Sequence, residues 1–203
     1  MLVLDFIINA IIVVATVLSI ASYYRESNGR TPKENLQYAF IFYTTLSNFF
    51  SMLTSIWVLI EEAGSLSSGV LTLSLPWVLI RYVFVVSVMV TFLTVVVYLA
   101  PAYGFKSQYA RDEMHMHLFG PLLAFISFCF IEKTTVLPAW RLLSGGSSVI
   151  VYGAVYLNNV LRTKKWDDFY LFTKINWRIS LGVMVSVGYL LGSAIYLLHN
   201  LGL

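Results

Sequence analysis

The sequence predicts an all-α membrane protein, a single bundle of six transmembrane helices formed by residues 1–203. Composition is the first observation, because 59% of the 203 residues are hydrophobic and 11% are charged, whereas about 25% are charged in ordinary soluble domains. The second is length, because several uninterrupted apolar stretches reach the ~20 residues that cross a bilayer. Backbone polar groups in lipid must be satisfied internally, so these stretches are expected to be helices.

The six spans are separated by short polar segments that contain helix breakers. In chain order we expect the spans at 3–24, 37–60, 75–100, 113–132, 142–162 and 177–199. The first has no basic residue before it and no small-residue cleavage pattern after it, so it is expected to be a retained span rather than a signal peptide. The later boundaries fall at "RESNGRTPKEN", "EEAGSLSSG", "PAYGFKSQYARD", "EKTTVLPAW" and "RTKKWDDFYLFTK".

The distribution of Lys and Arg predicts the orientation of the bundle. Loops one, three and five carry ten basic residues, whereas the opposite loops carry only Lys133 and Arg141. Basic residues concentrate on the cytoplasmic side of a membrane, so both termini are expected outside. The net charge of +3 is too small to indicate nucleic-acid binding. The ten basic residues are Arg25, Arg30, Lys33, Lys106, Arg111, Arg162, Lys164, Lys165, Lys174 and Arg178.

Three charged residues, Asp5, Arg81 and Glu132, are expected near the outer ends of the first, third and fourth spans. The guanidinium of Arg81 keeps its proton, and an unpaired buried charge would be strongly destabilising. Asp5 and Glu132 are the carboxylates available to it, so we expect a structural ion pair. The alternative is a clamp for a substrate carboxylate or a lipid headgroup.

A second polar layer is expected in the cytoplasmic half, and its densest stretch is "YTTLSN" at residues 43–48. Five of these six side chains carry a hydroxyl or an amide. In a helix, Thr44 and Asn48 share a face and Thr45 lies about 100° around it. Polar groups in spans are costly and usually face the bundle interior or a water-filled cavity.

The fourth and fifth spans add polar residues to the same layer. His115 and His117 are two positions apart, so their side chains are expected to point to different sides of the helix. Pro121 lies four residues after His117 and cannot donate to its carbonyl, which predicts a kink there. Asn158 and Asn159 lie near the cytoplasmic end of the fifth span.

This layer contains the groups for nucleophilic catalysis. A threonine hydroxyl becomes a nucleophile when a base takes its proton, and histidine is the usual base. Thr44 or Thr45, facing His117, would supply both groups. The structural alternative is that these hydroxyls bond to the preceding helical turn or tie helices together without any chemistry.

Other polar residues have supporting roles in this hypothesis. Asn48 or Asn159 would donate a hydrogen bond to a developing oxyanion, and Asn158 would help to bind the ligand. His115 is a second candidate base. Asp167, in the last loop, is expected at a level where it could hydrogen-bond a histidine.

No metal site and no cofactor are expected. His115 and His117 have the wrong spacing for one helical metal site, which favours i, i+4. The "GGSS" at residues 145–148 lacks the lysine that follows in a phosphate-binding loop. Gly188 and Gly192 form a GxxxG, which indicates close packing of the sixth span against a neighbour.

The last loop mixes basic residues with aromatic ones. Such residues are typical interface anchors at the headgroup level. The alternative is that they guide an anionic lipid head toward the inner polar layer. The aromatic residues are Trp166, Phe169, Tyr170 and Phe172.

Two stretches, "FYTTLSNFF" in the second span and "HLFGP" in the fourth, resemble the androgen-induced family of six-pass membrane proteins. Similar motifs occur in bacterial six-pass proteins, whereas the loops and tails do not match. The animal members are threonine hydrolases that cleave ester bonds in branched fatty-acid lipids and depend on a histidine. The resemblance implies Thr44, or Thr45, as nucleophile and His117 as base. It also places the chain in a bacterial plasma membrane.

The sequence therefore predicts an intramembrane lipid ester hydrolase or acyl transferase. Its expected partner is membrane lipid, with a fatty-acyl ester as substrate. The alternative is a small-solute carrier or substrate-binding membrane subunit, whose polar layers would have to connect into one path. A third possibility is a purely structural or regulatory subunit, in which the inner polar groups would be paired helix to helix.

Overall fold

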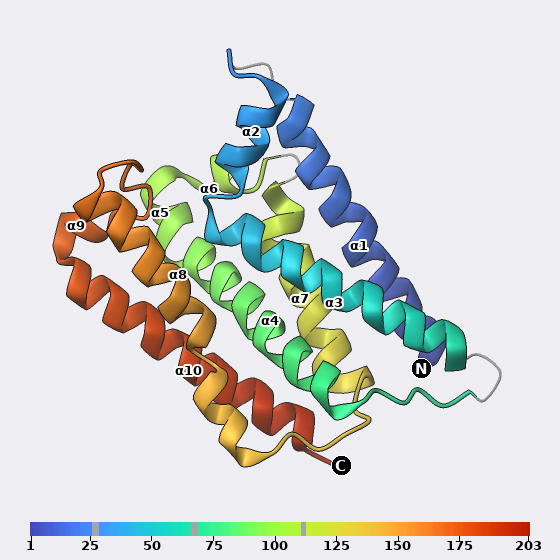
Figure 1. The fold of residues 1–203 in the computed structure, drawn as a ribbon. Helices are drawn as coiled ribbons and strands as arrows, with labels where there is room; N and C mark the ends of the chain where they lie inside the picture. The colour runs from blue at the N-terminus through green and yellow to red at the C-terminus, as the bar shows by residue number, and fades with distance from the viewer. Residues whose placement is uncertain (26–28, 66–68, 111–112) are drawn as a thin grey trace.

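The computed structural model describes residues 1–25, 29–65, 69–110 and 113–203. Every regular secondary-structure element in this part of the chain is a helix (Figure 1). Four of the described helical stretches are long and apolar enough to cross a membrane. They are α1 (Leu2–Arg25), α3 (Tyr43–Ser65), the stretch Leu75–Tyr103 that begins with α4 (Leu75–Thr94), and α10 (Trp177–Asn200).

Shorter elements complete the described chain. Four are π-helical, η1 (Val95–Leu99), η2 (His115–Phe119), η3 (Ser127–Ile131) and η5 (Asn158–Arg162), and η4 (Ala139–Ser144) is a 3₁₀ helix. The remaining α-helices are α2 (Pro32–Ala39), α5 (Ala100–Tyr103), α6 (Phe105–Gln108), α7 (Gly120–Ile126), α8 (Ser147–Leu157) and α9 (Phe172–Ile175).

The predicted all-α class is confirmed, but six spans are not. The predicted fourth span forms the helix His115–Ile131, which is shorter than the four long stretches. The predicted fifth span begins late, because residues 139–144 form η4 and α8 starts only at Ser147. Pro138 precedes η4 and two glycines follow it, and these residues interrupt a regular α-helix.

Helix α4 forms the centre of the bundle. It packs against α3, α7, α8 and α10, and α1 covers α3 on the far side (Figure 1). Tyr82, Val85, Val86, Val88 and Val90 of α4 have no exposed surface. A helix that is apolar all round is expected to be buried on all sides.

The GxxxG of the sixth span packs closely against a neighbouring segment. A Cβ atom on Gly192 would lie 2.8 Å from the Cα of Gly145, and one on Gly188 would lie 3.2 Å from the Cα of Gly146. The "GG" of "GGSS" therefore faces the glycines of α10, and the absence of side chains lets the two backbones approach.

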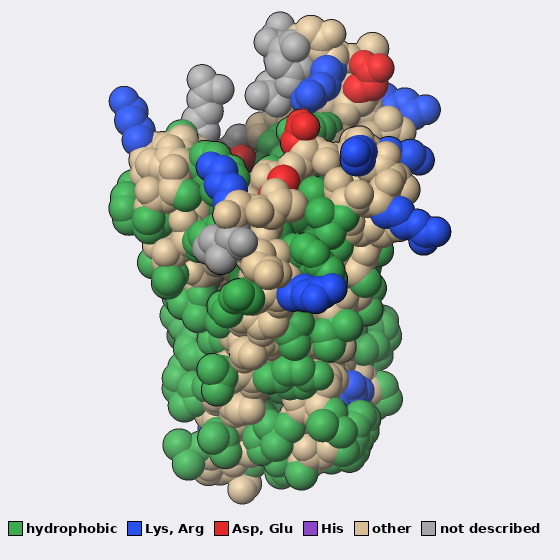
Figure 2. Space-filling model, turned by 90° about the vertical axis from the view of Figure 1, so that its left-hand side faces the viewer, with side chains coloured by type: hydrophobic (Ala, Val, Ile, Leu, Met, Phe, Trp, Pro, Cys, Tyr) green, Lys and Arg blue, Asp and Glu red, His purple; other side chains and the backbone are tan. Residues whose placement is uncertain are grey.

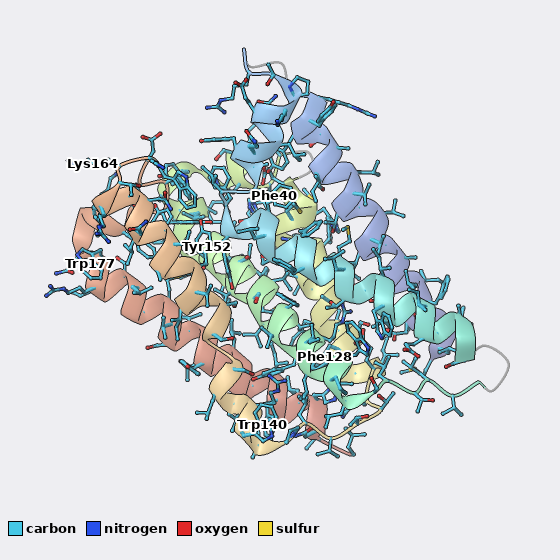
Figure 3. All side chains as sticks on the ribbon, in the orientation of Figure 1. Phe40, Phe128, Trp140, Tyr152, Lys164 and Trp177 are labelled. Carbon is cyan, nitrogen blue, oxygen red and sulfur yellow. The ribbon has the colours of Figure 1, made fainter. Side chains whose placement is uncertain are left out.

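The predicted second span is broken near its beginning. Helix α2 ends at Ala39 and α3 starts at Tyr43, although no proline or glycine marks the break. Two tyrosines from distant parts of the chain satisfy the freed backbone groups. The Tyr170 hydroxyl accepts the N–H of Tyr43 at 3.0 Å, and Tyr152, beside the start of α3 (Figure 3), donates to the carbonyl of Ile41 at 2.7 Å.

Charged and hydrophobic side chains occupy different zones along the long direction of the bundle. In the face drawn in Figure 2, most Lys and Arg side chains gather over one end of the molecule, above a broad hydrophobic band. This is the end at which α2, α6 and α9 lie, and both chain termini lie toward the opposite end (Figure 1). The fold is compatible with an integral membrane protein.

Candidate functional site

A cavity of about 450 Å³ lies at the basic end of the bundle, where α3 begins. Thr44, Thr45 and His117 all line it, so the three predicted catalytic residues share one chamber. All three side chains are buried. The remaining lining residues are Tyr23, Tyr38, Phe42, Leu99, Tyr103, Ser107, Gln108, Glu113, Phe169 and Tyr170.

The ring of His117 is held by two groups. Its Nδ1 lies 2.7 Å from the backbone carbonyl oxygen of Gln108. A carbonyl can only accept, so Nδ1 carries a hydrogen and Nε2 is the nitrogen that exchanges a proton. Nε2 lies 3.3 Å from the Glu113 carboxylate, which in turn accepts the Tyr23 hydroxyl at 2.6 Å. A carboxylate also only accepts, so Nε2 can take a proton from threonine only when it carries no hydrogen toward Glu113.

Thr44 and Thr45 stand in the first turn of α3, where a helix leaves its N–H groups without internal partners. The N–H of Tyr43 is satisfied by Tyr170, and that of Leu46 by the carbonyl of Phe42. Within the described part of the chain, no group accepts the N–H of Thr44 or Thr45, and the Thr45 hydroxyl makes no hydrogen bond. Two backbone donors and a hydroxyl are therefore available beside the cavity.

Asn48 does not supply a free donor, contrary to the oxyanion role expected for it. Its side-chain nitrogen donates to the carbonyls of Thr44 and Met116, both at 2.9 Å. The second bond has a physical cause in the π-turn η2, in which the N–H of Gly120 bonds to the carbonyl of His115, five residues earlier. Pro121 has no N–H to continue that pattern, so the Met116 carbonyl is left for Asn48. Asn48 is a tie between helices.

His115 lies outside the cavity. Its Nε2 is 3.2 Å from the Thr16 hydroxyl on α1. The two histidines thus point to different sides, as their spacing predicts, and this geometry favours His117 over His115 as the base.

A second, apolar cavity adjoins the polar one. Thr44, Leu99 and Tyr170 line both the polar chamber and a narrow apolar cavity of about 30 Å³ between α3, α4, α8 and α10. That cavity in turn shares four lining residues with an apolar crevice of about 340 Å³ between α4 and α10, which are Thr94, Tyr170, Phe172 and Met184. Val97 and Ile179 on the wall of the crevice are mostly exposed, so it opens on the hydrophobic surface.

The loop before α9 positions Tyr170 over this junction. Tyr156 donates to the carboxylate of Asp168 at 2.8 Å and accepts the N–H of Tyr170 at 3.0 Å. Asp168 also accepts the N–H groups of Phe172 and Thr173 at 2.9 and 2.8 Å. Partial burial opposes ionisation of Asp168, but the hydrogen bonds led by those from Thr173 outweigh it and hold the pKa of this carboxyl below its ordinary value.

Three of the predicted binding residues do not reach the cavity. Asn158 is exposed, and the side chain of Asn159 donates to the carbonyl of Val155 in its own helix at 2.9 Å. Asp167 is also exposed, and the structured carboxylate of this loop is that of its neighbour Asp168. Depth in the membrane predicts these positions, but depth does not determine which face of a helix a residue occupies.

The outer polar layer also comes together. Arg81 donates to both oxygens of Glu132 at 2.8 and 3.1 Å, and both side chains are almost fully buried. Asp5 joins the pair indirectly, because the Ser127 hydroxyl lies 2.5 Å from Asp5 and 2.6 Å from Glu132.

Several site residues were missed by reasoning from the sequence. Glu113 had a usable signal, since it lies four residues before His117 on one helical face. Gln108 and Tyr23 had none, because each reaches the cavity through tertiary packing, and Tyr170 is expected from the sequence only as an interface anchor or lipid guide. Among the described residues, no group of three or more His, Cys, Asp or Glu side chains could hold a metal ion.

No protein-family model matches the sequence, and neither a curated protein nor a solved structure matches the chain.

Proposed function

We propose that this protein is an intramembrane hydrolase or acyl transferase that acts on lipid esters, like the androgen-induced family that its motifs resemble. One observation carries the proposal. Thr44 lies where a polar chamber that contains His117 meets an apolar cavity leading toward the hydrophobic surface. A lipid ester has the matching shape, with a polar carbonyl group next to an acyl chain.

In the proposed reaction, the hydroxyl of Thr44 or Thr45 attacks the ester carbonyl while Nε2 of His117 takes its proton. The C–O bond to the alcohol then breaks, and His117 returns the proton to the leaving oxygen. Water, or an acceptor alcohol, releases the acyl group from threonine by the reverse sequence. Glu113 stabilises the imidazolium that forms each time His117 takes up a proton, since its carboxylate lies 3.3 Å from Nε2.

The unpaired N–H groups at the start of α3 are the proposed oxyanion donors, in place of Asn48. They belong to Thr44 and Thr45 and lie at the positive end of the helix dipole. A donor already placed in a dry site stabilises a developing oxyanion by about 3 kcal/mol.

The proposed topology keeps six crossings. The helix His115–Ile131 and the segment formed by α8 and η5 would be two shorter spans. The basic end would face the cytoplasm of a bacterial cell, with both termini outside, following the charge rule. The catalytic cavity would then open to the cytoplasmic leaflet.

The test is hydrolysis of a fluorogenic fatty-acyl ester by the purified protein in detergent. His117→Ala is expected to lower the rate about 10²–10⁴-fold, the usual worth of a general base. One of Thr44→Ala and Thr45→Ala should abolish turnover. Ser47→Ala is the matched control, because it removes a buried hydroxyl from the same helix outside the polar cavity. Equal activity in all four variants would contradict the proposal.

A small-solute carrier is the second candidate, and one observation favours it. The buried face of α3 is polar along most of its length, from the inner cavity to the outer ion pair, through Thr44, Ser47, Asn48, Ser51, Thr54, Ser55 and Glu62. A carrier would admit water along this stripe. A Ser51→Cys variant in a Cys129→Ala background would then react with a membrane-impermeant maleimide, whereas the hydrolase predicts no labelling.

A further inference from the structure

The outer polar cluster contains more acid than the ion pair needs. Asp5, Glu62 and Glu132 have no exposed surface, and Arg81 is 2% exposed. These residues come from α1, from α3, from the turn after η3 and from α4 respectively. Three ionised carboxylates around one guanidinium would leave two uncompensated negative charges in the bundle. Buried charges without a partner are strongly unfavourable.

The ion pair accounts for one of the three carboxylates. Glu132 accepts two hydrogen bonds from Arg81, at 2.8 and 3.1 Å, which is the geometry of an ionised carboxylate. Asn9, Thr54 and Ser55 take up further N–H groups of the guanidinium at 2.7–3.1 Å. The charge of Arg81 is therefore already balanced by Glu132.

The contacts of Ser127 require a hydrogen on Asp5. The hydroxyl of Ser127 lies 2.5 Å from Asp5 Oδ1 and 2.6 Å from Glu132 Oε1. A serine has one hydroxyl hydrogen and can donate it to only one of them. Because Glu132 is the ionised partner of Arg81, the serine donates to Glu132 and the other bond must be donated by Asp5.

Glu62 is the unexplained member of the cluster. Neither of its oxygens, nor Asp5 Oδ2, has a hydrogen-bond partner among the described residues. The carboxyls of Glu62 and Asp5 interact side chain to side chain, and Glu132 and Arg81 act on Glu62 through their charges. A hydrogen between the two carboxyls would give each of them a partner.

We propose that Asp5 and Glu62 form a proton-binding site that holds two exchangeable protons. Glu62 donates to Asp5 Oδ2, Asp5 donates through Oδ1 to Ser127, and Ser127 donates to Glu132. Both oxygens of Asp5 and of Glu132, and one oxygen of Glu62, then carry a hydrogen or accept one, and the cluster is neutral. Loss of the protons would place two like charges between α1 and α3. The site is separate from the threonine and histidine of the polar cavity.

Infrared spectroscopy of the protein in lipid at neutral pH tests the proposal. The C=O stretch of a protonated carboxylic acid is resolved from that of a carboxylate and shifts in deuterated water. The signal is expected to fall in Asp5→Asn and in Glu62→Gln. Glu61→Gln is the matched control, because it changes the neighbouring residue, which is partly exposed, and should leave the signal unchanged.

Isotope labelling decides the question if the variants do not fold. In the wild-type protein, ¹³C-aspartate and ¹³C-glutamate should each shift part of the acid band, since one residue of each kind carries a proton. The absence of a protonated-acid band would overturn the proposal, as would a band that persists in both variants. A band that moves with one label only would also overturn it.

Discussion

Gly192→Ala offers a sharp test of the packing between α10 and the segment before α8. The new methyl group would lie 2.8 Å from the Cα of Gly145 and 2.8 Å from the hydroxyl oxygen of Tyr82, whereas ordinary contact begins at 3.4 Å. The backbone of Gly145 cannot move aside as a flexible side chain can, so α10 and the segment before α8 must separate. Overpacking of this kind costs about 1–3 kcal/mol of unfolding free energy.

Gly182→Ala is the matched control in the same helix, because its methyl group would meet no atom within 4 Å. Alanine also favours the helix over glycine by about 0.5–1 kcal/mol at both positions, so that gain cancels between the two variants. The Gly192→Ala protein should therefore be about 1–3 kcal/mol less stable than the Gly182→Ala protein. Unfolding by SDS in mixed micelles, followed by tryptophan fluorescence, measures the difference. Equal stabilities would refute the close approach.

Three further predictions follow from the contacts. Glu132→Ala leaves Arg81 buried without its counter-charge and should cost about 3–5 kcal/mol of unfolding free energy, and an Arg81→Met change added to it should restore part of the loss in the same SDS assay. Asn48→Ala leaves the Met116 carbonyl unsatisfied and should cost about 1–3 kcal/mol, yet the folded fraction should keep its esterase activity if backbone groups bind the oxyanion. Because the pKa of Asp168 is lowered, its carboxylate stabilises the loop at neutral pH, and this stabilisation is lost as the pH falls through the lowered pKa. Hydrogen exchange of the loop in the wild-type protein should therefore rise only in acid. In Asp168→Asn, hydrogen exchange should already be raised at neutral pH.

Reasoning from the sequence recovered the class of the protein because lipid imposes a composition and a length that are visible residue by residue. It also anticipated that Arg81 would need a buried carboxylate and that His115 and His117 would face different sides. Both inferences depend on local geometry or on the cost of an unpaired charge, and neither needs the tertiary fold.

The remaining features depend on tertiary contacts. The break before α3 is stabilised by the hydroxyl groups of Tyr152 and Tyr170, which lie more than a hundred residues away in the sequence. The local apolar pattern does not show the break and therefore predicts one continuous span. The same break places Thr44 in a first helical turn rather than in mid-helix. The polar stretch "EEAGSLSSG" predicts that Glu62 lies in a loop, whereas α3 continues to Ser65 and buries it.

The central claim is that a threonine hydroxyl in the polar cavity is activated by His117. Intact-mass analysis after treatment with a fluorophosphonate probe, followed by peptide mapping, tests this claim most directly. A single adduct on Thr44 or Thr45 that disappears in His117→Ala but persists in His115→Ala is the predicted result. Folded protein that takes up no adduct at either threonine, or that labels equally without His117, would contradict it.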